Sequence, residues 1–269
     1  MTYLKQILLV FAFISAFTSF FIGIISCQKG ISYPPGVPIE KEEIKNTIDY
    51  GDYHIDASSQ VVEKGATGFQ AYTSKSWKNG IVPVKFHSNI TEAQKDLFWK
   101  ACAEWSKVAK VRCRAKSLFE SSYLLVTNTK AANRCWTELG AGNSGGERVF
   151  NFAADWCWNP VSLLHELGHV LGLIHEHQRP DRDQYIEVFP ENAGEMSYSY
   201  DKLSLGSMDN SGPYDFLSIM HYWNAAYSIN GKLIMVPRPG FEKFASVMGY
   251  ATKLSAGDQV LIQKIYGAK

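Results

Sequence analysis

The sequence lacks a dominant charge, because 27 basic side chains are balanced by 26 acidic ones and the formal net charge at pH 7 is +1. Proteins that bind nucleic acid or an acidic membrane surface through electrostatics carry an excess of one charge, which this composition does not provide. Internal repeats are also absent, including the glycine-aspartate repeats that bind calcium in some secreted proteins. We therefore expect no nucleic-acid partner, and the function must be sought in local chemistry.

The chain has 269 residues, of which 46% are hydrophobic, and this is the composition of a globular protein. This length accommodates one sizeable domain with accessory segments, or two domains.

An apolar run over residues 7–25 follows Lys5 and ends in Ser26 and Cys27. A basic residue before such a run is typical of an export signal, so we assign residues 1–27 to one. The small residue before Cys27 is typical of a bacterial lipobox, in which the cysteine is lipidated and anchors the chain to a membrane. An ordinary cleaved signal and an uncleaved anchor are the alternatives, because the run is close to the length that spans a bilayer.

The sequence has five cysteines, and setting Cys27 aside leaves an even set of four. In an exported chain, this set predicts two disulfides and an oxidising compartment. Four cysteines allow three pairings, and their spacing does not choose among them. The four residues are Cys102, Cys113, Cys135 and Cys157.

The segment after Cys27 begins with a proline-rich stretch at residues 33–38, which favours an extended spacer. The polar stretch from Glu40 to about Lys75 has weak periodicity, and we interpret it as a prosegment; a disordered linker is the alternative. We predict that residues 28–66 form the spacer and prosegment, and that residues 67–269 form the folded domain.

Capping boxes predict the starts of two α-helices, at Thr91 with Gln94 and at Ser255 with Asp258. Apolar residues recur at helical spacing after each cap, and we assign the first stripe to the core because such stripes pack far more often than they bind ligands. Its members are Leu97, Phe98, Ala101, Trp105 and Val108.

Strands are predicted at residues 81–86, 123–127 and 148–152, where β-branched and aromatic residues cluster. The glycine-rich residues 140–146 lack the strand-to-helix context of a phosphate-binding loop, so we interpret them as a turn.

A further helix is predicted after Asn159, an N-cap residue, because Pro160 is favoured at the first helical position. This helix carries the sequence His165-Glu166-Leu167-Gly168-His169. Two imidazoles four positions apart lie on the same face of a helix, one turn from each other, and can share one metal ion.

The pattern continues through Gly172, which can end the helix and turn the chain, to His175, which can supply a third ligand. Three imidazoles leave the fourth position of a Zn²⁺ ion to water, which is the arrangement of a catalytic site. Zinc lowers the pKa of that water to about 7, and Glu166 can accept its proton as general base. A surface cluster of histidines without metal is the alternative.

Residues 165–183 read HELGHVLGLIHEHQRPDRD and resemble the extended astacin signature HExxHxxGxxHExxRxDRD, with every fixed letter present. Residues 218–222, SIMHY, resemble the Met-turn of that family, and residues 77–83, WKNGIVP, resemble the start of its catalytic domain. The resemblance to the astacin metzincins, of bacterial type, covers the chain from Trp77 to its end.

The resemblance implies that Met220 forms an apolar base beneath the metal. It implies that Tyr222 is a further zinc ligand that swings away to stabilise the oxyanion, whereas a packed core tyrosine is the alternative. Glu176 is similar to the residue that anchors the new amino terminus of the activated enzyme. An edge strand that pairs with extended substrate is implied at Arg148, Val149, Phe150, Asn151 and Phe152.

The family's internal disulfide corresponds to Cys135 and Cys157, so the resemblance implies that pair. Its other bridge ends at a cysteine near the carboxyl terminus that this chain lacks, which leaves Cys102 with Cys113 as an inference outside the family pattern. Leu173 also departs from the family, which usually has phenylalanine there; both are apolar, and we expect little effect.

In the family that this sequence resembles, the prosegment usually keeps the enzyme latent by blocking the zinc with an aspartate of an F-x-G-D motif. Here Tyr50-Gly51-Asp52 keeps the glycine and the aspartate with a shifted aromatic, so Asp52 is our candidate for the blocking group. The thiolate of Cys27, if it is not lipidated, is the rival. His54 lies close by in sequence, and a plain turn at Gly51 is a further alternative.

We therefore predict an α+β metzincin domain with a twisted sheet, two long helices above the zinc cleft and a less regular half after Gly172. Its predicted activity is cleavage of internal peptide bonds in extended protein substrates, with one catalytic zinc, by a monomer that is secreted or lipid-anchored. The alternatives are a zinc peptidase of another clan, an inactive peptide-binding lipoprotein of the same fold, and a surface lipoprotein with structural zinc.

Overall fold

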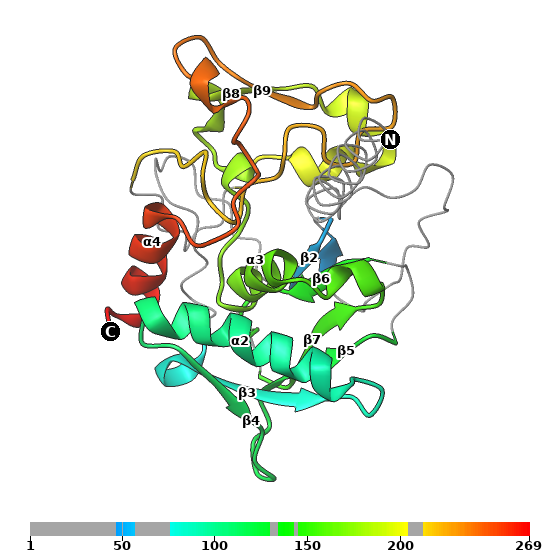
Figure 1. Ribbon diagram of the computed structural model, residues 1–269, viewed down its shortest axis with the longest axis vertical. Helices are drawn as coiled ribbons and strands as arrows, with labels where there is room; N and C mark the ends of the chain where they lie inside the picture. The colour runs from blue at the N-terminus through cyan, green and yellow to red at the C-terminus, as the bar shows by residue number, and fades with distance from the viewer. Residues whose placement is uncertain (1–46, 50, 57–75, 130–133, 143–144, 204–211) are drawn as a thin grey trace, which may run out of the picture.

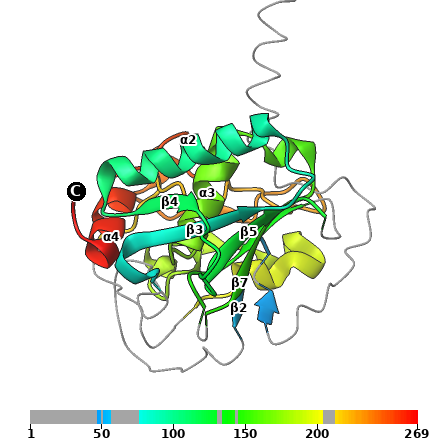
Figure 2. The same cartoon turned by 90° about the horizontal axis from the view of Figure 1, so that it is seen from below.

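The computed structural model describes residues 47–49, 51–56, 76–129, 134–142, 145–203 and 212–269. Its centre is a seven-stranded mixed sheet in the order β1-β2-β6-β7-β5-β3-β4. The strands are β1 (Thr47–Asp49), β2 (Tyr53–Asp56), β3 (Ile81–Phe86), β4 (Arg112–Ala115), β5 (Tyr123–Thr127), β6 (Cys135–Glu138) and β7 (Glu147–Phe152). The helices α2 (Glu92–Val108) and α3 (Pro160–Val170) lie over the same face of this sheet (Figures 1 and 2).

The order of the strands corrects the predicted edge strand. β7, which contains residues 148–152, pairs in parallel with β5 on one side and antiparallel with β6 on the other, so it lies inside the sheet. β6 would form the edge of the sheet if the β1–β2 hairpin were absent, because β2 pairs in parallel with its other side. The pattern of residue types could not distinguish β7 from an edge strand, since both are apolar and extended.

Both predicted capping boxes are present. The backbone N–H of Gln94 donates to the Thr91 hydroxyl over 3.3 Å, and the backbone N–H of Thr91 donates to the Gln94 side chain over 2.9 Å, at the start of α2. The Ser255 hydroxyl receives the backbone N–H of Asp258 in the same way at α4 (Ala256–Tyr266). These caps satisfy amide groups that the first turn of a helix leaves without partners.

The main core lies between the sheet and the helices, and the predicted stripe of α2 contributes Phe98, Ala101 and Trp105 to it. Two tryptophans of this core also bind α3 through hydrogen bonds. The Trp105 indole donates to the Leu164 carbonyl over 3.1 Å, and the Trp77 indole donates to the Val170 carbonyl over 2.7 Å. α3 is therefore fixed by directional contacts as well as by apolar packing.

The chain after Gly172 is less regular, as predicted. It contains the two-stranded antiparallel sheet of β8 (Ile186–Val188) and β9 (Met235–Pro237) and the helix α4. Most other regular segments are 3₁₀ helices, and such helices also occur earlier in the chain. Within the described residues, the 3₁₀ helices are η3 (Lys78–Gly80), η4 (Asp155–Cys157), η5 (Glu176–Gln178), η6 (Arg182–Gln184), η7 (Pro190–Tyr200) and η8 (Glu242–Phe244).

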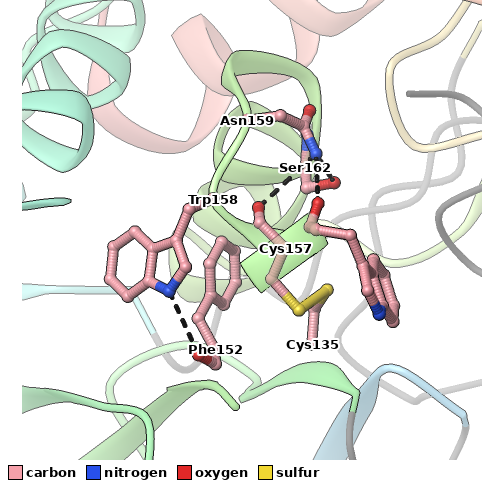
Figure 3. Close-up of a disulfide and its surroundings, with 7 residues drawn as sticks. Cys135, Phe152, Cys157, Trp158, Asn159 and Ser162 are labelled. Atoms are coloured by element: carbon pink, nitrogen blue, oxygen red, sulfur yellow. Dashed lines mark hydrogen bonds between the residues drawn. A yellow bond between two sulfur atoms is a disulfide. The ribbon is translucent and has the colours of Figure 1, made fainter. Parts of the chain in front are cut away.

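Two disulfides join the four cysteines named above. Cys102 of α2 is bonded to Cys113 of β4, and Cys135 of β6 is bonded to Cys157 of η4. Figure 3 shows the second pair just before α3, where the Asn159 side chain caps the helix by accepting the backbone N–H of Ser162. This disulfide connects β6 to the segment that begins the histidine-bearing helix.

No helix within the described ranges is long and apolar enough to cross a membrane. The apolar run of residues 7–25, Cys27 and the proline-rich spacer lie outside those ranges.

Candidate metal centre and active site

The side chains of the three signature histidines converge, although two come from a helix and one comes from the segment after it. His165 and His169 lie one turn apart on α3, which ends at Val170. Gly172 then adopts a φ of 97°, a backbone conformation that strongly favours glycine, and the chain turns back. After this turn, the side chain of His175 lies beside those of His165 and His169. The turn at Gly172 therefore brings in the third histidine, as the sequence predicted.

The Nε2 atoms of the three imidazoles are turned toward one another, with every pair 3.2 Å apart. Each Nδ1 atom has an acceptor outside the cluster, which fixes the proton on Nδ1 and leaves the Nε2 lone pair free. The acceptors are the Ile219 carbonyl for His165 at 2.7 Å, the Leu173 carbonyl for His169 at 2.7 Å, and the Gln178 side-chain oxygen for His175 at 3.0 Å.

Asp52 supplies the fourth corner of this cluster. Its carboxylate oxygens lie 3.2 Å from Nε2 of His165, 3.7 Å from that of His169 and 3.0 Å from that of His175. A tetrahedron of ligands around zinc has edges of about 3.3 Å when the bonds are about 2.0 Å long. Three imidazole nitrogens and a carboxylate group, whose Oδ2 faces His165 and whose Oδ1 faces His169 and His175, fit a Zn²⁺ ion at these separations.

The charges of the cluster agree with metal binding. Burial lowers the pKa of His169 and of His175, and for His169 the neighbouring His175 lowers it further. Burial opposes ionisation of Asp52, but the attraction of His175 and His165 brings its pKa well below the usual value. Both shifts run in the direction that zinc binding requires, since an imidazole ligand must be free of its Nε2 proton and a carboxylate ligand must be ionised.

Glu166 lies beside the cluster and is buried, with 2% of its surface exposed. Its Oε2 atom has no hydrogen-bond partner among the described residues. Burial raises the pKa of this carboxyl well above its usual value, and the negative charge of Asp52 raises it further. A buried carboxyl oxygen without a protein partner next to a metal site is suited to hold a water molecule or a substrate group.

The Met-turn lies beneath the histidines, where Met220 packs against Gly168 of α3 so closely that a side chain at that glycine would collide with the methionine sulfur. Asp258 of α4 holds this turn. Its carboxylate accepts the Ser218 hydroxyl over 2.6 Å and the backbone N–H of Ile219 over 2.9 Å. The same Ile219 orients His165 through its carbonyl, so Asp258 acts on the metal centre through one intervening residue.

Tyr222 is buried against the third histidine, with its ring 4.2 Å from that of His175. A methyl group added to Gly51 would lie 3.1 Å from the Tyr222 hydroxyl, which places this hydroxyl next to the residue before Asp52. Burial raises the pKa of Tyr222 well above its usual value, so the phenol keeps its proton and can donate a hydrogen bond.

Glu176, the predicted anchor of a new amino terminus, is buried and has partners within the chain. It accepts Arg179 over 2.7 Å and the backbone N–H of Asp215 over 2.8 Å. Burial raises its pKa to about 7, although the charge of Arg179 opposes the shift. Its role in an activated form stays a prediction.

The hairpin that carries Asp52 is attached along β6. The backbone N–H of Thr137 donates to the Asp52 carbonyl over 3.0 Å, and that of Leu139 donates to the His54 carbonyl over 2.8 Å. Arg134 donates to the Gly51 carbonyl over 3.0 Å. The His54 side chain is not part of the metal cluster and packs on Trp136, with ring centroids 4.6 Å apart.

Sequence patterns missed three residues that act at this centre. Tyr53 follows Asp52 directly and stacks on His169 at 4.3 Å, but a lone tyrosine carries no motif. Gln178 stands at a variable position of the signature. Asp258 was recognised only as a helix cap, and its second contact with the Met-turn is a long-range feature that no local pattern reports.

Comparison with known proteins agrees with this geometry. The family model described as Astacin (Peptidase family M12A) matches residues 69–267. The zinc metalloproteinase nas-14 of Caenorhabditis elegans is 30% identical over 237 residues, which are 86% of this chain and 45% of that protein. Mouse tolloid-like protein 1 is 31% identical over 198 residues, 72% of this chain and 19% of that protein. The chain thus corresponds to less than half the length of these two relatives.

Among solved structures, high choriolytic enzyme 1, a hatching enzyme zinc-protease from the medaka fish Oryzias latipes, superposes with a TM-score of 0.63 at 26% identity. The superposition covers 74% of this chain and 97% of the fish enzyme. The matched family model spans the α3 histidines, the Gly172 turn and the Met-turn that build the centre. The chain therefore belongs to the astacin family, peptidase family M12A.

Proposed function

We propose that the chain is a zinc-dependent endopeptidase, made as a latent proenzyme, that hydrolyses internal peptide bonds of protein substrates. The convergence of three Nε2 atoms and the Asp52 carboxylate on one point, beside the buried Glu166, carries this proposal. The donor set fits zinc, and the family of the chain is one of zinc peptidases.

His165, His169 and His175 would hold the metal. A bound Zn²⁺ ion would act as a Lewis acid and lower the pKa of a water molecule to about 7. Glu166 then accepts a proton from the attacking water and transfers it to the leaving amine. Tyr222 donates its hydroxyl to the carbonyl oxygen of the substrate as that oxygen gains negative charge. Met220 supports the three ligands from below through its contact with Gly168.

The position of Asp52 supports latency, because its carboxylate lies at the corner of the cluster that a catalytic water would need. The hairpin also occupies the free side of β6, and the backbone of an extended substrate can add to that side only after β2 has left. We therefore assign the substrate-binding edge to β6, in place of residues 148–152, and the blocking group to Asp52 rather than Cys27 or His54.

Residues 1–27 are proposed as the export signal, with Cys27 as the site of lipid attachment, and residues 28–66 as the spacer and prosegment. The two disulfides support export into an oxidising compartment. We propose that the mature enzyme is a monomer.

The test is a proteome-derived peptide library incubated with the exported protein after proteolytic removal of the prosegment. Cleavage of internal bonds should stop when a zinc chelator is added and resume with Zn²⁺. Glu166→Ala should retain one zinc per chain while its rate falls by on the order of 100-fold to 10,000-fold. His169→Ala should lose the metal itself. Near-normal turnover by Glu166→Ala would contradict the mechanism.

The inactive peptide-binding alternative is not favoured, because the general base and the three metal ligands are all in place. Structural zinc is not favoured either, because the fourth ligand comes from the hairpin that we assign to the removable segment.

A further inference from the structure

Gln178 of η5 is fully buried beside the third histidine, and both ends of its side-chain amide form hydrogen bonds. The amide nitrogen donates to the Ser199 carbonyl over 3.1 Å. The amide oxygen faces two donors, Nδ1 of His175 at 3.0 Å and the Tyr53 hydroxyl at 2.6 Å. The Ser199 carbonyl can only accept, so it fixes which end of the amide is the oxygen.

This arrangement sets His175 apart from the other two ligands. His165 and His169 are oriented by backbone carbonyls, which every residue type provides. His175 is oriented by a side chain, and a substitution at position 178 can therefore remove its acceptor. Because the acceptor holds the proton on Nδ1, it leaves Nε2 of His175 available to the metal.

Tyr53 brings the hairpin into the same network. Its ring stacks on His169 with centroids 4.3 Å apart, and it meets His175 edge-on at 5.0 Å. Its hydroxyl reaches the amide oxygen that already receives His175. The residue after the blocking carboxylate is thus bonded to the group that orients a metal ligand.

We propose that Gln178 is a positioning residue that holds His175 ready for zinc, and that Tyr53 couples docking of the hairpin to zinc retention through Gln178. The inference rests on the proposed function, since it concerns the same metal and the same prosegment. Coupling of this kind is reciprocal, so a docked hairpin strengthens zinc binding and bound zinc strengthens docking by the same factor.

The experiment measures the affinity of unprocessed full-length protein for Zn²⁺ by competition with a chromophoric chelator. Gln178→Met should bind zinc about 10-fold to 100-fold more weakly, the usual effect of losing a partner of a metal-bound histidine. Gln178→Asn, which keeps an amide but withdraws its oxygen, should also bind more weakly. Gln178→Glu keeps an acceptor for His175 but sets its second oxygen against the Ser199 carbonyl, so it should recover only part of the affinity. Gln263→Met is the matched control, because the side chain of Gln263 in α4 donates to the Val108 carbonyl at the end of α2 and is not part of the metal cluster.

The coupling is tested with Tyr53→Phe, which keeps the ring and Asp52 but removes one hydrogen bond. Zinc affinity should fall about fivefold, as expected for roughly 1 kcal/mol. In the Gln178→Met background the same change should have almost no effect, because the shared acceptor is gone. Additive effects of the two substitutions would overturn the coupling.

Parental zinc affinity in both folded variants, Gln178→Met and Gln178→Asn, would overturn the positioning role. Thermal unfolding of the metal-free proteins identifies any variant that has not folded. Failure of the proposed function gives a different result, namely a parent protein that binds no zinc or that cleaves no peptide after processing.

Discussion

The domain has two halves that are held together by different kinds of interaction, although both supply the metal centre. Residues 76–170 form a sheet and two helices with a large apolar core and both described disulfides. The half after Gly172 has no cysteine and a smaller aromatic core, and buried polar groups such as Arg179 and Asp258 hold its turns. His165 and His169 come from the first half, whereas His175, Met220 and Tyr222 come from the second. The geometry of the centre therefore depends on contacts that join the halves.

The hairpin contacts both halves and carries the carboxylate at the metal centre, because β2 pairs with β6 of the first half while Gly51 lies against Ser199 and Tyr222 of the second. Asp52→Ala should therefore give the largest effect. Peptidase activity of the unprocessed protein should rise on the order of 100-fold, as expected if the open form changes from a minor to the dominant population.

Cys27→Ser is the matched comparison for that rise, and it should leave the unprocessed protein inactive. Both variants are assayed on the same fluorogenic peptide before any processing. If Cys27→Ser unlocks the enzyme and Asp52→Ala does not, the blocking group is the thiol, and the assignment of Cys27 to a lipid anchor is wrong as well.

The disulfides test how far the first half depends on covalent links. Replacing Cys135 and Cys157 by serine should lower the free energy of unfolding by about 3.4 kcal/mol, from the loop entropy that a separation of 22 residues implies. The Cys102 and Cys113 pair, 11 residues apart, should cost about 2.8 kcal/mol. Urea unfolding of both double variants measures this, and an equal or reversed order would count against the loop-entropy explanation.

The second half should respond most to Asp258, whose carboxylate accepts Ser218, the backbone of Ile219 and the backbone of Ser255. Asp258→Ala should cost about 2 to 3 kcal/mol of unfolding free energy, because buried donors lose a charged acceptor. Zinc affinity should fall as well, since Ile219 orients His165. A loss of stability with unchanged zinc affinity would show that the Met-turn keeps its position without α4.

The same contrast explains how much of the structure the sequence could predict. The starts of α2, α3 and α4 follow from local signals, because a cap satisfies amides of its own helix. The zinc ligands were predictable for a similar reason, since a spacing of four residues fixes two imidazoles on one helical face.

Other features depend on partners far along the chain and left no local pattern. β6 is a run of four buried residues without alternation, and β2 contains a histidine and an aspartate, so neither was predicted as a strand. The assignment of residues 148–152 to the edge was wrong because position within a sheet depends on pairing order. Gln178 and Tyr53 are 125 residues apart and meet only after folding.

The smallest predicted effect compares one local motif in the two halves. Thr91 and Ser255 are both N-caps in capping boxes, and an alanine at either should cost about 1 kcal/mol of stability through the lost cap. Thr91 is exposed, and the bonds of its side chain stay within its own box. The Ser255 hydroxyl also donates to the Asp215 carboxylate over 2.5 Å, and the backbone N–H of Asp215 donates to Glu176 next to His175.

Thr91→Ala should therefore lower the melting temperature without changing zinc affinity or kcat/KM of the processed enzyme. Ser255→Ala should lower stability somewhat more and should also weaken zinc binding by a few-fold, because the Asp215 side chain loses a donor that holds it near the third ligand. Ser255→Thr, which retains a hydroxyl, should restore both properties. If both alanine variants lower the melting temperature by the same amount and neither changes zinc affinity, the contact of Ser255 with Asp215 does not support the metal centre. The cap of α4 is then as independent of the site as the cap at Thr91.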